Sequence, residues 1–104
     1  AEKKRACERL LHISIECLID ICALLVRGLR LGLPAEEGDL FNKLEAARVI
    51  TGDMRDRLKA MRGFRNILVH RYGEVDNELT FENLSRLDDF EEFRRQITAF
   101  IRSL

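Results

Sequence analysis

The chain has 104 residues, of which 46% are hydrophobic and 35% are charged, with one proline, no tryptophan and a formal net charge of zero. This length supports one modest hydrophobic core and excludes two. The longest nearly apolar run, residues 17–26, is about ten residues long and contains Asp20, so it is too short to cross a bilayer.

The three cysteines, Cys7, Cys17 and Cys22, all lie in the first third of the chain. They form no Cys-x-x-Cys pair, and nothing resembling a zinc ligand set accompanies them. No secretory signal is recognisable. We therefore expect reduced cysteines that pack in the core of a cytoplasmic protein with no membrane contact.

The charges are unevenly distributed along the neutral chain. Residues 1–42 contain six Lys/Arg and seven Asp/Glu. Residues 43–72 contain eight Lys/Arg and three Asp/Glu, whereas residues 73–104 contain four Lys/Arg and eight Asp/Glu. A local excess of positive charge attracts polyanions even when the total charge is zero. The alternative is a solvated helix face whose cations pair with the acidic C-terminal segment.

The first predicted helix extends from Glu2 to about Leu31. Its apolar residues recur at steps of three and four, and a second apolar set widens the stripe, which is typical of a central helix with several partners. The main set is Cys7, Leu10, Leu11, Leu18, Ile21, Cys22, Leu25 and Leu29. Gly28, Gly32 and Pro34 are expected to end the helix, and residues 34–38 to form a loop.

Three further helices follow at the same period. Asp39 is the expected N-cap of the second, which Thr51 and Gly52 end, and Asp53 is the expected N-cap of the third, which reaches Tyr72. A polar turn over residues 73–79 precedes a final helical stretch over residues 80–102, with a break at Asp88 and Asp89. The sequence thus predicts an all-α, up-and-down bundle of four or five helices.

Polar residues of catalytic type cluster in residues 64–72, within the basic third of the chain. On an ideal helix with Arg65 at 0°, Asn66 lies at about 100°, His70 at about 140° and Tyr72 at about 340°. Arg65, Asn66 and His70 therefore share one broad face, where Asn66 and His70 can touch because they are four residues apart.

These residue types suit metal-independent cleavage of RNA. An imidazole with an unperturbed pKa of about 6.5 can take a proton from a ribose 2′-hydroxyl or give one to the leaving 5′-oxygen. The guanidinium of Arg65 can hold the scissile phosphate, while Asn66 orients His70 or donates to phosphate. Since one helix supplies one histidine, a two-fold dimer would complete the site. The alternative is that Arg65 pairs with an acidic residue of the C-terminal helix and His70 is an ordinary helix-end histidine.

The motifs resemble those of the HepT toxins, a family of the HEPN ribonuclease superfamily. The similarity comprises Ile15-Glu-x-Leu-Ile-Asp-Ile21, a Gly/Pro loop, Phe41-x-x-Leu44 and Met61-x-x-Phe-Arg-Asn-x-Leu-Val-His-x-Tyr72. The resemblance implies one HEPN-like domain over residues 1–104 that acts as a homodimeric endoribonuclease toxin. Arg65 and His70 would be its catalytic residues and Asn66 would support them. No cofactor is implied.

The resemblance also implies a type II-like toxin–antitoxin pairing. Its partner would be a minimal nucleotidyltransferase antitoxin of the MntA kind, which in that family silences the toxin by adding AMP to the motif tyrosine, here Tyr72. Family members carry a further N-terminal helix before the residue 15–21 segment, whereas little precedes that segment here. Either the sequence lacks that helix or this member is short.

Several other side chains allow more than one interpretation. His12, Glu16 and Asp20 share a helix face, but without a second ligand cluster we expect no metal. Glu16 or Asp20 is instead expected to pair with an arginine, Arg65 among the candidates. The arginines Arg62 and Arg71 are expected to bind RNA phosphate, although the basic run around Arg62 also suits an acidic antitoxin. The rival functions are a non-catalytic module that binds a nucleotidyltransferase and a purely structural helical dimer.

Overall fold

The computed structural model describes residues 2–70 and 87–104. It contains the helices α1 (Glu2–Gly28), α2 (Asp39–Ala46), α3 (Gly52–His70) and α5 (Leu87–Arg102), and no strand occurs among the described residues. The predicted all-α fold is confirmed. The predicted end of the third helix at Tyr72, the polar turn and the beginning of the last helical stretch lie outside the described residues.

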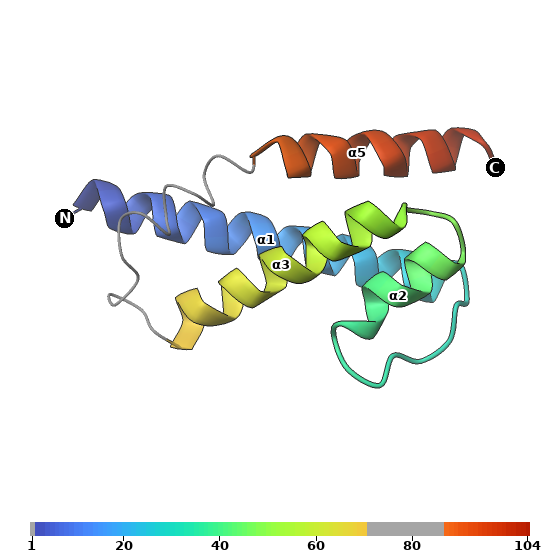
Figure 1. Ribbon diagram of the computed structural model, residues 1–104, viewed down its shortest axis with the longest axis horizontal. Helices are drawn as coiled ribbons and strands as arrows, with labels where there is room; N and C mark the ends of the chain where they lie inside the picture. The colour runs from blue at the N-terminus through green and yellow to red at the C-terminus, as the bar shows by residue number, and fades with distance from the viewer. Residues whose placement is uncertain (1, 71–86) are drawn as a thin grey trace.

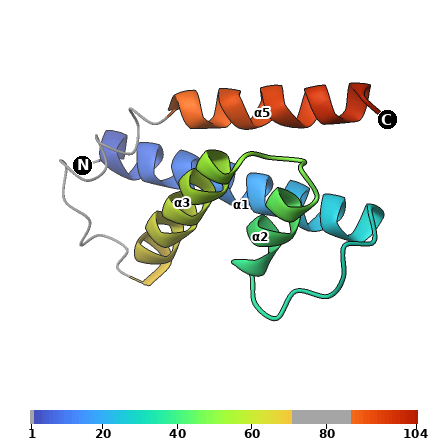
Figure 2. The same cartoon turned by 45° about the vertical axis from the view of Figure 1, so that its right-hand side comes forward.

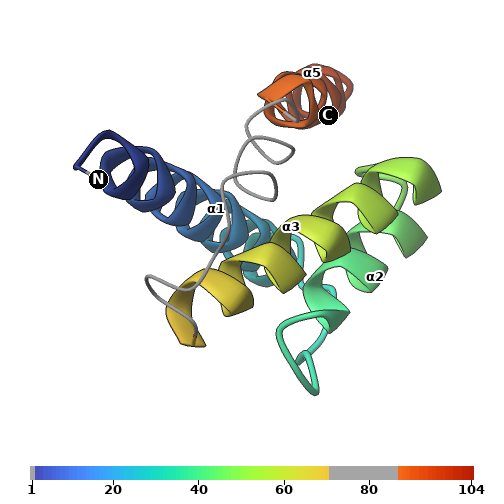
Figure 3. The same ribbon diagram turned by 60° about the vertical axis from the view of Figure 1, so that its left-hand side comes forward.

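The long helix α1 and the crossing helix α3 organise the structure (Figure 1). Both α1 and α3 pack against α2, and α3 also packs against α5. The views in Figures 2 and 3 place α5 along one side of the α1–α3 pair, with α2 beside α3. None of the described helices is long and apolar enough to cross a membrane.

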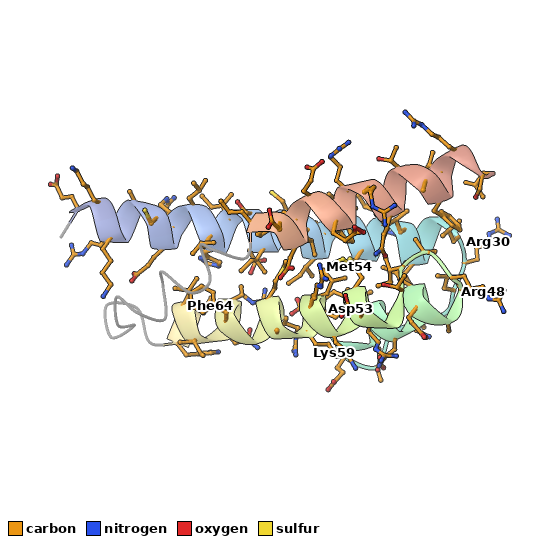
Figure 4. All side chains as sticks on the ribbon, turned by 45° about the horizontal axis from the view of Figure 1, so that its top comes forward. Arg30, Arg48, Asp53, Met54, Lys59 and Phe64 are labelled. Atoms are coloured by element: carbon orange, nitrogen blue, oxygen red, sulfur yellow. The ribbon has the colours of Figure 1, made fainter. Side chains whose placement is uncertain are left out.

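The hydrophobic core lies between α1, α2 and α3. Its fully buried side chains come from all three helices. Met54 is one of them, and it lies on the side of α3 that faces the opposite helices (Figure 4). The largest of them are Phe41, Ile15, Leu44, Met54, Leu58 and Cys22. Burial raises the pKa of the Cys22 thiol to about 12, so this cysteine stays protonated and acts as a small apolar residue. Phe93 is the one buried residue of α5, with 5% of its surface exposed.

One face of α1 departs from the prediction that several partners bury this helix. Leu10 and Leu24 are 63% and 60% exposed, and Ile13, Ile21 and Cys17 are also exposed. The packing of α2 and α3 against one side of α1 accounts for the difference, because no described element covers the opposite side. The expectation that Cys17 and Leu10 pack in the core was wrong.

The helix α1 ends at Gly28, one of the residues expected to end it, whereas α2 ends at Ala46, before the expected Thr51 and Gly52; an arginine in a left-handed conformation follows each helix end. Arg30 and Arg48 have φ values of 55° and 61°, in the left-handed region. The backbone N–H of the residue after each arginine donates a hydrogen bond to a carbonyl oxygen in the last turn of the helix. These bonds join Leu31 N to Val26 O and Val49 N to Leu44 O, both at 2.9 Å. These are Schellman caps, and the two side chains point outward at the same end of the molecule (Figure 4).

The helix starts also differ from the expected caps. The hydroxyl of Thr51 caps α3 by accepting a hydrogen bond from Met54 N at 3.1 Å, so Thr51 replaces Asp53 in this role. Gly38 is the N-cap residue of α2 and makes no side-chain cap bond; Asp39 instead accepts a hydrogen bond from Ala35 N at 2.9 Å. Asp88 and Asp89 lie in the first turn of α5, where the helix dipole favours acidic side chains. Because α5 is described only from Leu87, the predicted break between a short helix and this longer one falls at the edge of the described residues.

Candidate functional site

The guanidinium of Arg65 lies at the centre of a polar network on α3. Its Nε donates to Asn66 Oδ1 at 2.9 Å, its Nη1 donates to Glu16 and its Nη2 donates to Glu37. Only 11% of the Arg65 side chain is exposed. All three guanidinium nitrogens therefore have partners, and their orientation is fixed by elements distant in sequence.

The carboxylate partners come from two different parts of the fold. Glu16 lies on α1, and its Oε1 is also 3.5 Å from His12 Nε2. Glu37 lies in the loop before α2, where its Oε1 also accepts a hydrogen bond from Arg62 Nε at 2.7 Å. Thus α1, α3 and the loop between α1 and α2 meet at this network.

Of the two carboxylates expected to pair with an arginine, it is Glu16 that does so, and its partner is the candidate Arg65. The rival expectation, that Arg65 pairs with the C-terminal helix, is not met by the described part of that helix, residues 87–102. It is Arg57 that reaches α5, with Nη1 3.2 Å from Asp89 Oδ1. Sequence reasoning missed Glu37, because a glutamate in a Gly/Pro loop carries no periodic signal that indicates which surface the loop contacts.

The electrostatic interactions between Arg65 and Glu16 favour the ionised form of both side chains. The hydrogen bond from Arg65 lowers the pKa of the Glu16 carboxyl below its ordinary value of 4.5. Burial on its own lowers the pKa of Arg65, but the hydrogen bonds and charges of Glu16 and Glu37 outweigh it and raise the pKa above its ordinary value. Arg65 is therefore a permanent cation held in a defined orientation.

The remaining predicted site residues lie in different environments. His70 is the last residue of α3 and is exposed. Asn66 bonds Arg65, and no hydrogen bond links it to His70 among the described residues, although the helix brings both to the same broad face. Arg71 and Tyr72 lie outside the described residues. No group of three or more His, Cys, Asp or Glu within residues 2–70 and 87–104 is arranged to hold a metal ion.

An all-α bundle with an Arg-x₄-His segment on its third described helix is the arrangement of a HEPN-type protein. Residues 1–97 match the family model described as "Ribonuclease HepT-like". The chain belongs to this family.

Named relatives extend the comparison. An mRNA nuclease HepT from Shewanella oneidensis is 38% identical over 85 residues, which cover 81% of this chain and 64% of the relative. A tRNA nuclease HepT from Aphanizomenon flos-aquae is 27% identical over 104 residues, covering 99% and 71%. The chain therefore spans slightly less than two thirds of the Shewanella protein that it matches.

Solved structures agree with this fold. A toxin–antitoxin crystal structure with AMP-PNP superposes with a TM-score of 0.82 at 34% identity, covering 89% of this chain and 71% of the other. The tri-AMPylated Shewanella oneidensis HEPN toxin, in complex with its MNT antitoxin, gives a TM-score of 0.77 at 36% identity, covering 86% and 68%.

Proposed function

We propose that this chain is a metal-independent endoribonuclease toxin in which Arg65 and His70 are the catalytic residues. The observation that supports this most strongly is the oriented, mostly buried cation of Arg65 five residues before His70, in a chain of the HepT-like family. The nuclease names of two relatives agree with it.

In the proposed reaction the ribose 2′-oxygen attacks the adjacent phosphorus and the bond from phosphorus to the 5′-oxygen breaks. His70 takes the 2′-hydroxyl proton or supplies a proton to the leaving oxygen. Arg65 stabilises the negative charge that develops on the phosphate, and Asn66 orients the guanidinium through the bond to its Nε. Arg62 and Arg71 are proposed to bind flanking phosphates.

A second copy of the chain is part of this proposal. Acid–base cleavage uses two proton-transfer steps, whereas one chain brings a single histidine to the motif. A two-fold dimer would bring two copies of α3 to one groove and supply the second imidazole.

The product ends test the proposed activity directly. Purified protein incubated with a labelled RNA and excess EDTA is expected to generate fragments with 2′,3′-cyclic phosphate and 5′-hydroxyl ends. Cleavage that EDTA abolishes, or fragments with 5′-phosphate ends, would contradict the proposed mechanism.

Regulation by a minimal nucleotidyltransferase antitoxin completes the proposal. The support is the AMPylated state named for the Shewanella toxin and its MNT partner. In this chain Tyr72 is the proposed modified residue, two positions after His70, where an added phosphate would compete with RNA for the same cations. Mass spectrometry after co-expression with the neighbouring nucleotidyltransferase gene product should find AMP on Tyr72, and a Tyr72→Phe variant should stay unmodified.

One observation favours a second candidate, a non-catalytic module that binds the nucleotidyltransferase. The charges of Arg62 and Arg65 are balanced by those of Glu16 and Glu37, so the network is neutral without any ligand. Purified protein that cleaves no RNA but binds the nucleotidyltransferase would establish this alternative.

A further inference from the structure

The loop between α1 and α2 contributes one carboxylate to the arginine network. Glu37 Oε1 accepts from Arg62 Nε at 2.7 Å and from Arg65 Nη2. One side chain thus bridges the catalytic arginine of the proposed function and the arginine proposed to bind RNA phosphate.

The donors of Arg65 reach three different acceptors. Its Nε, Nη1 and Nη2 each donate to an oxygen of Asn66, Glu16 or Glu37, which uses three of its five N–H groups. Glu37 is the acceptor that Arg65 shares with Arg62. An RNA phosphate that accepts these two hydrogen bonds, from Arg62 Nε and Arg65 Nη2, therefore has to replace Glu37.

The two carboxylates differ in how readily they can be replaced. Glu16 lies in the middle of a 27-residue helix and also contacts His12. Glu37 lies in the loop two residues before α2, outside any helix, and is the acceptor that Arg62 and Arg65 share. If the Glu37 carboxylate moved away, Arg62 and Arg65 would both lose this acceptor, while Glu16 would still hold Arg65 in place.

We propose that Glu37 occupies the phosphate-binding position between Arg62 and Arg65 and is displaced by the RNA backbone when substrate binds. This inference rests on the proposed function and adds an affinity-determining residue to it. The carboxylate keeps both guanidiniums oriented without substrate and weakens RNA binding, because every binding event has to break two ion pairs.

The test compares Glu37→Gln with Glu36→Gln. Both variants remove one negative charge from the same loop, but Glu36 is exposed and has no side-chain hydrogen bond or ion pair with any described residue. The probe is a fluorescent 2′-O-methyl RNA, which lacks the attacking hydroxyl. Glu37→Gln is expected to bind it about three- to tenfold more tightly than the natural protein, and Glu36→Gln to change the Kd less than about twofold. On cleavable RNA, the KM of Glu37→Gln should fall while kcat stays nearly constant.

Other outcomes would overturn the inference. An unchanged Kd for Glu37→Gln would show that Glu37 does not compete with phosphate. Weaker binding or a lower kcat, in a variant whose melting temperature equals that of the natural protein, would show that Glu37 positions the arginines for substrate.

Failure of the proposed function can be told apart from failure of this inference. If the natural protein neither binds nor cleaves RNA, the nuclease proposal fails. Titration with inorganic phosphate, followed by the Nε–H NMR resonance of Arg65, then decides the role of Glu37. A lower phosphate midpoint in Glu37→Gln supports displacement, and equal midpoints contradict it.

Discussion

The two ends of the proposed catalytic segment of α3 differ sharply in their surroundings. Arg65 is mostly buried and has hydrogen-bond partners on all three guanidinium nitrogens. His70, five residues later, is exposed at the helix end and has no hydrogen bond or ion pair within the described part of the chain. In the proposed site, the cation that would bind phosphate is thus held by residues of one chain, whereas the proposed proton transfer by His70 depends on what else approaches the end of α3.

Substitution of Arg65 should have the largest effect. In Arg65→Ala the phosphate loses its fixed cation, and Glu16 and Glu37 lose their shared partner, so we expect a fall in kcat of about 10³-fold or more. Lys59→Ala is the matched control, because Lys59 is an exposed cation on the same helix with no ion pair among the described residues. Cleavage by Arg65→Ala within tenfold of the natural rate would refute the assigned role.

His70→Ala is expected to reduce cleavage by about 10²- to 10⁴-fold, the usual contribution of a general acid or base. Since the side chain is exposed, the melting temperature should hardly change, in contrast to Arg65→Ala. His12→Ala removes the other histidine of the chain and should retain most of the activity. Equal activities for the two histidine variants would argue against a catalytic His70.

Glu16→Gln should have a smaller effect that isolates the orientation of Arg65. The amide keeps the shape of the carboxylate but loses its charge, so we expect kcat to fall with little change in KM. We also expect the free energy of unfolding to fall by about 0.5–1 kcal/mol. Asp20→Gln is the control, because Asp20 is an exposed carboxylate on the same helix. An effect on KM alone would assign Glu16 to substrate binding rather than to positioning.

The smallest expected effect is the pH dependence of the Glu16 pair. The pKa of Glu16 is lowered in the folded protein, so its stabilising contribution is present above 4.5 and is lost as the pH falls through the lower folded value. Urea unfolding of the natural protein and Glu16→Gln should therefore show a difference at neutral pH that disappears in acid, below the folded pKa of Glu16. A difference that persists in acid would mean that the charge of Glu16 is not its source.

The sequence predicted the all-α fold and the approximate helix positions, because helical periodicity is a local signal. It also predicted that Glu16 or Asp20 pairs with an arginine, because an unpaired charge on that helix is costly, but it left the choice of Glu16 and Arg65 open. It did not predict the left-handed caps at Arg30 and Arg48, since arginine is unusual in that conformation. Glu37 escaped prediction because the path of a loop depends on the packing of the helices that it joins. The exposed face of α1 shows the same limit, since an apolar stripe indicates burial but not the element that covers it.

The central claim is that Arg65 and His70 form a nuclease site that two copies of the chain complete. The most direct measurement is the cleavage rate per chain as a function of protein concentration, with the dimer fraction measured by sedimentation under the same conditions. The account predicts that the rate per chain rises in parallel with the dimer fraction and approaches zero for the monomer. A constant rate per chain at concentrations where the protein is monomeric would contradict it.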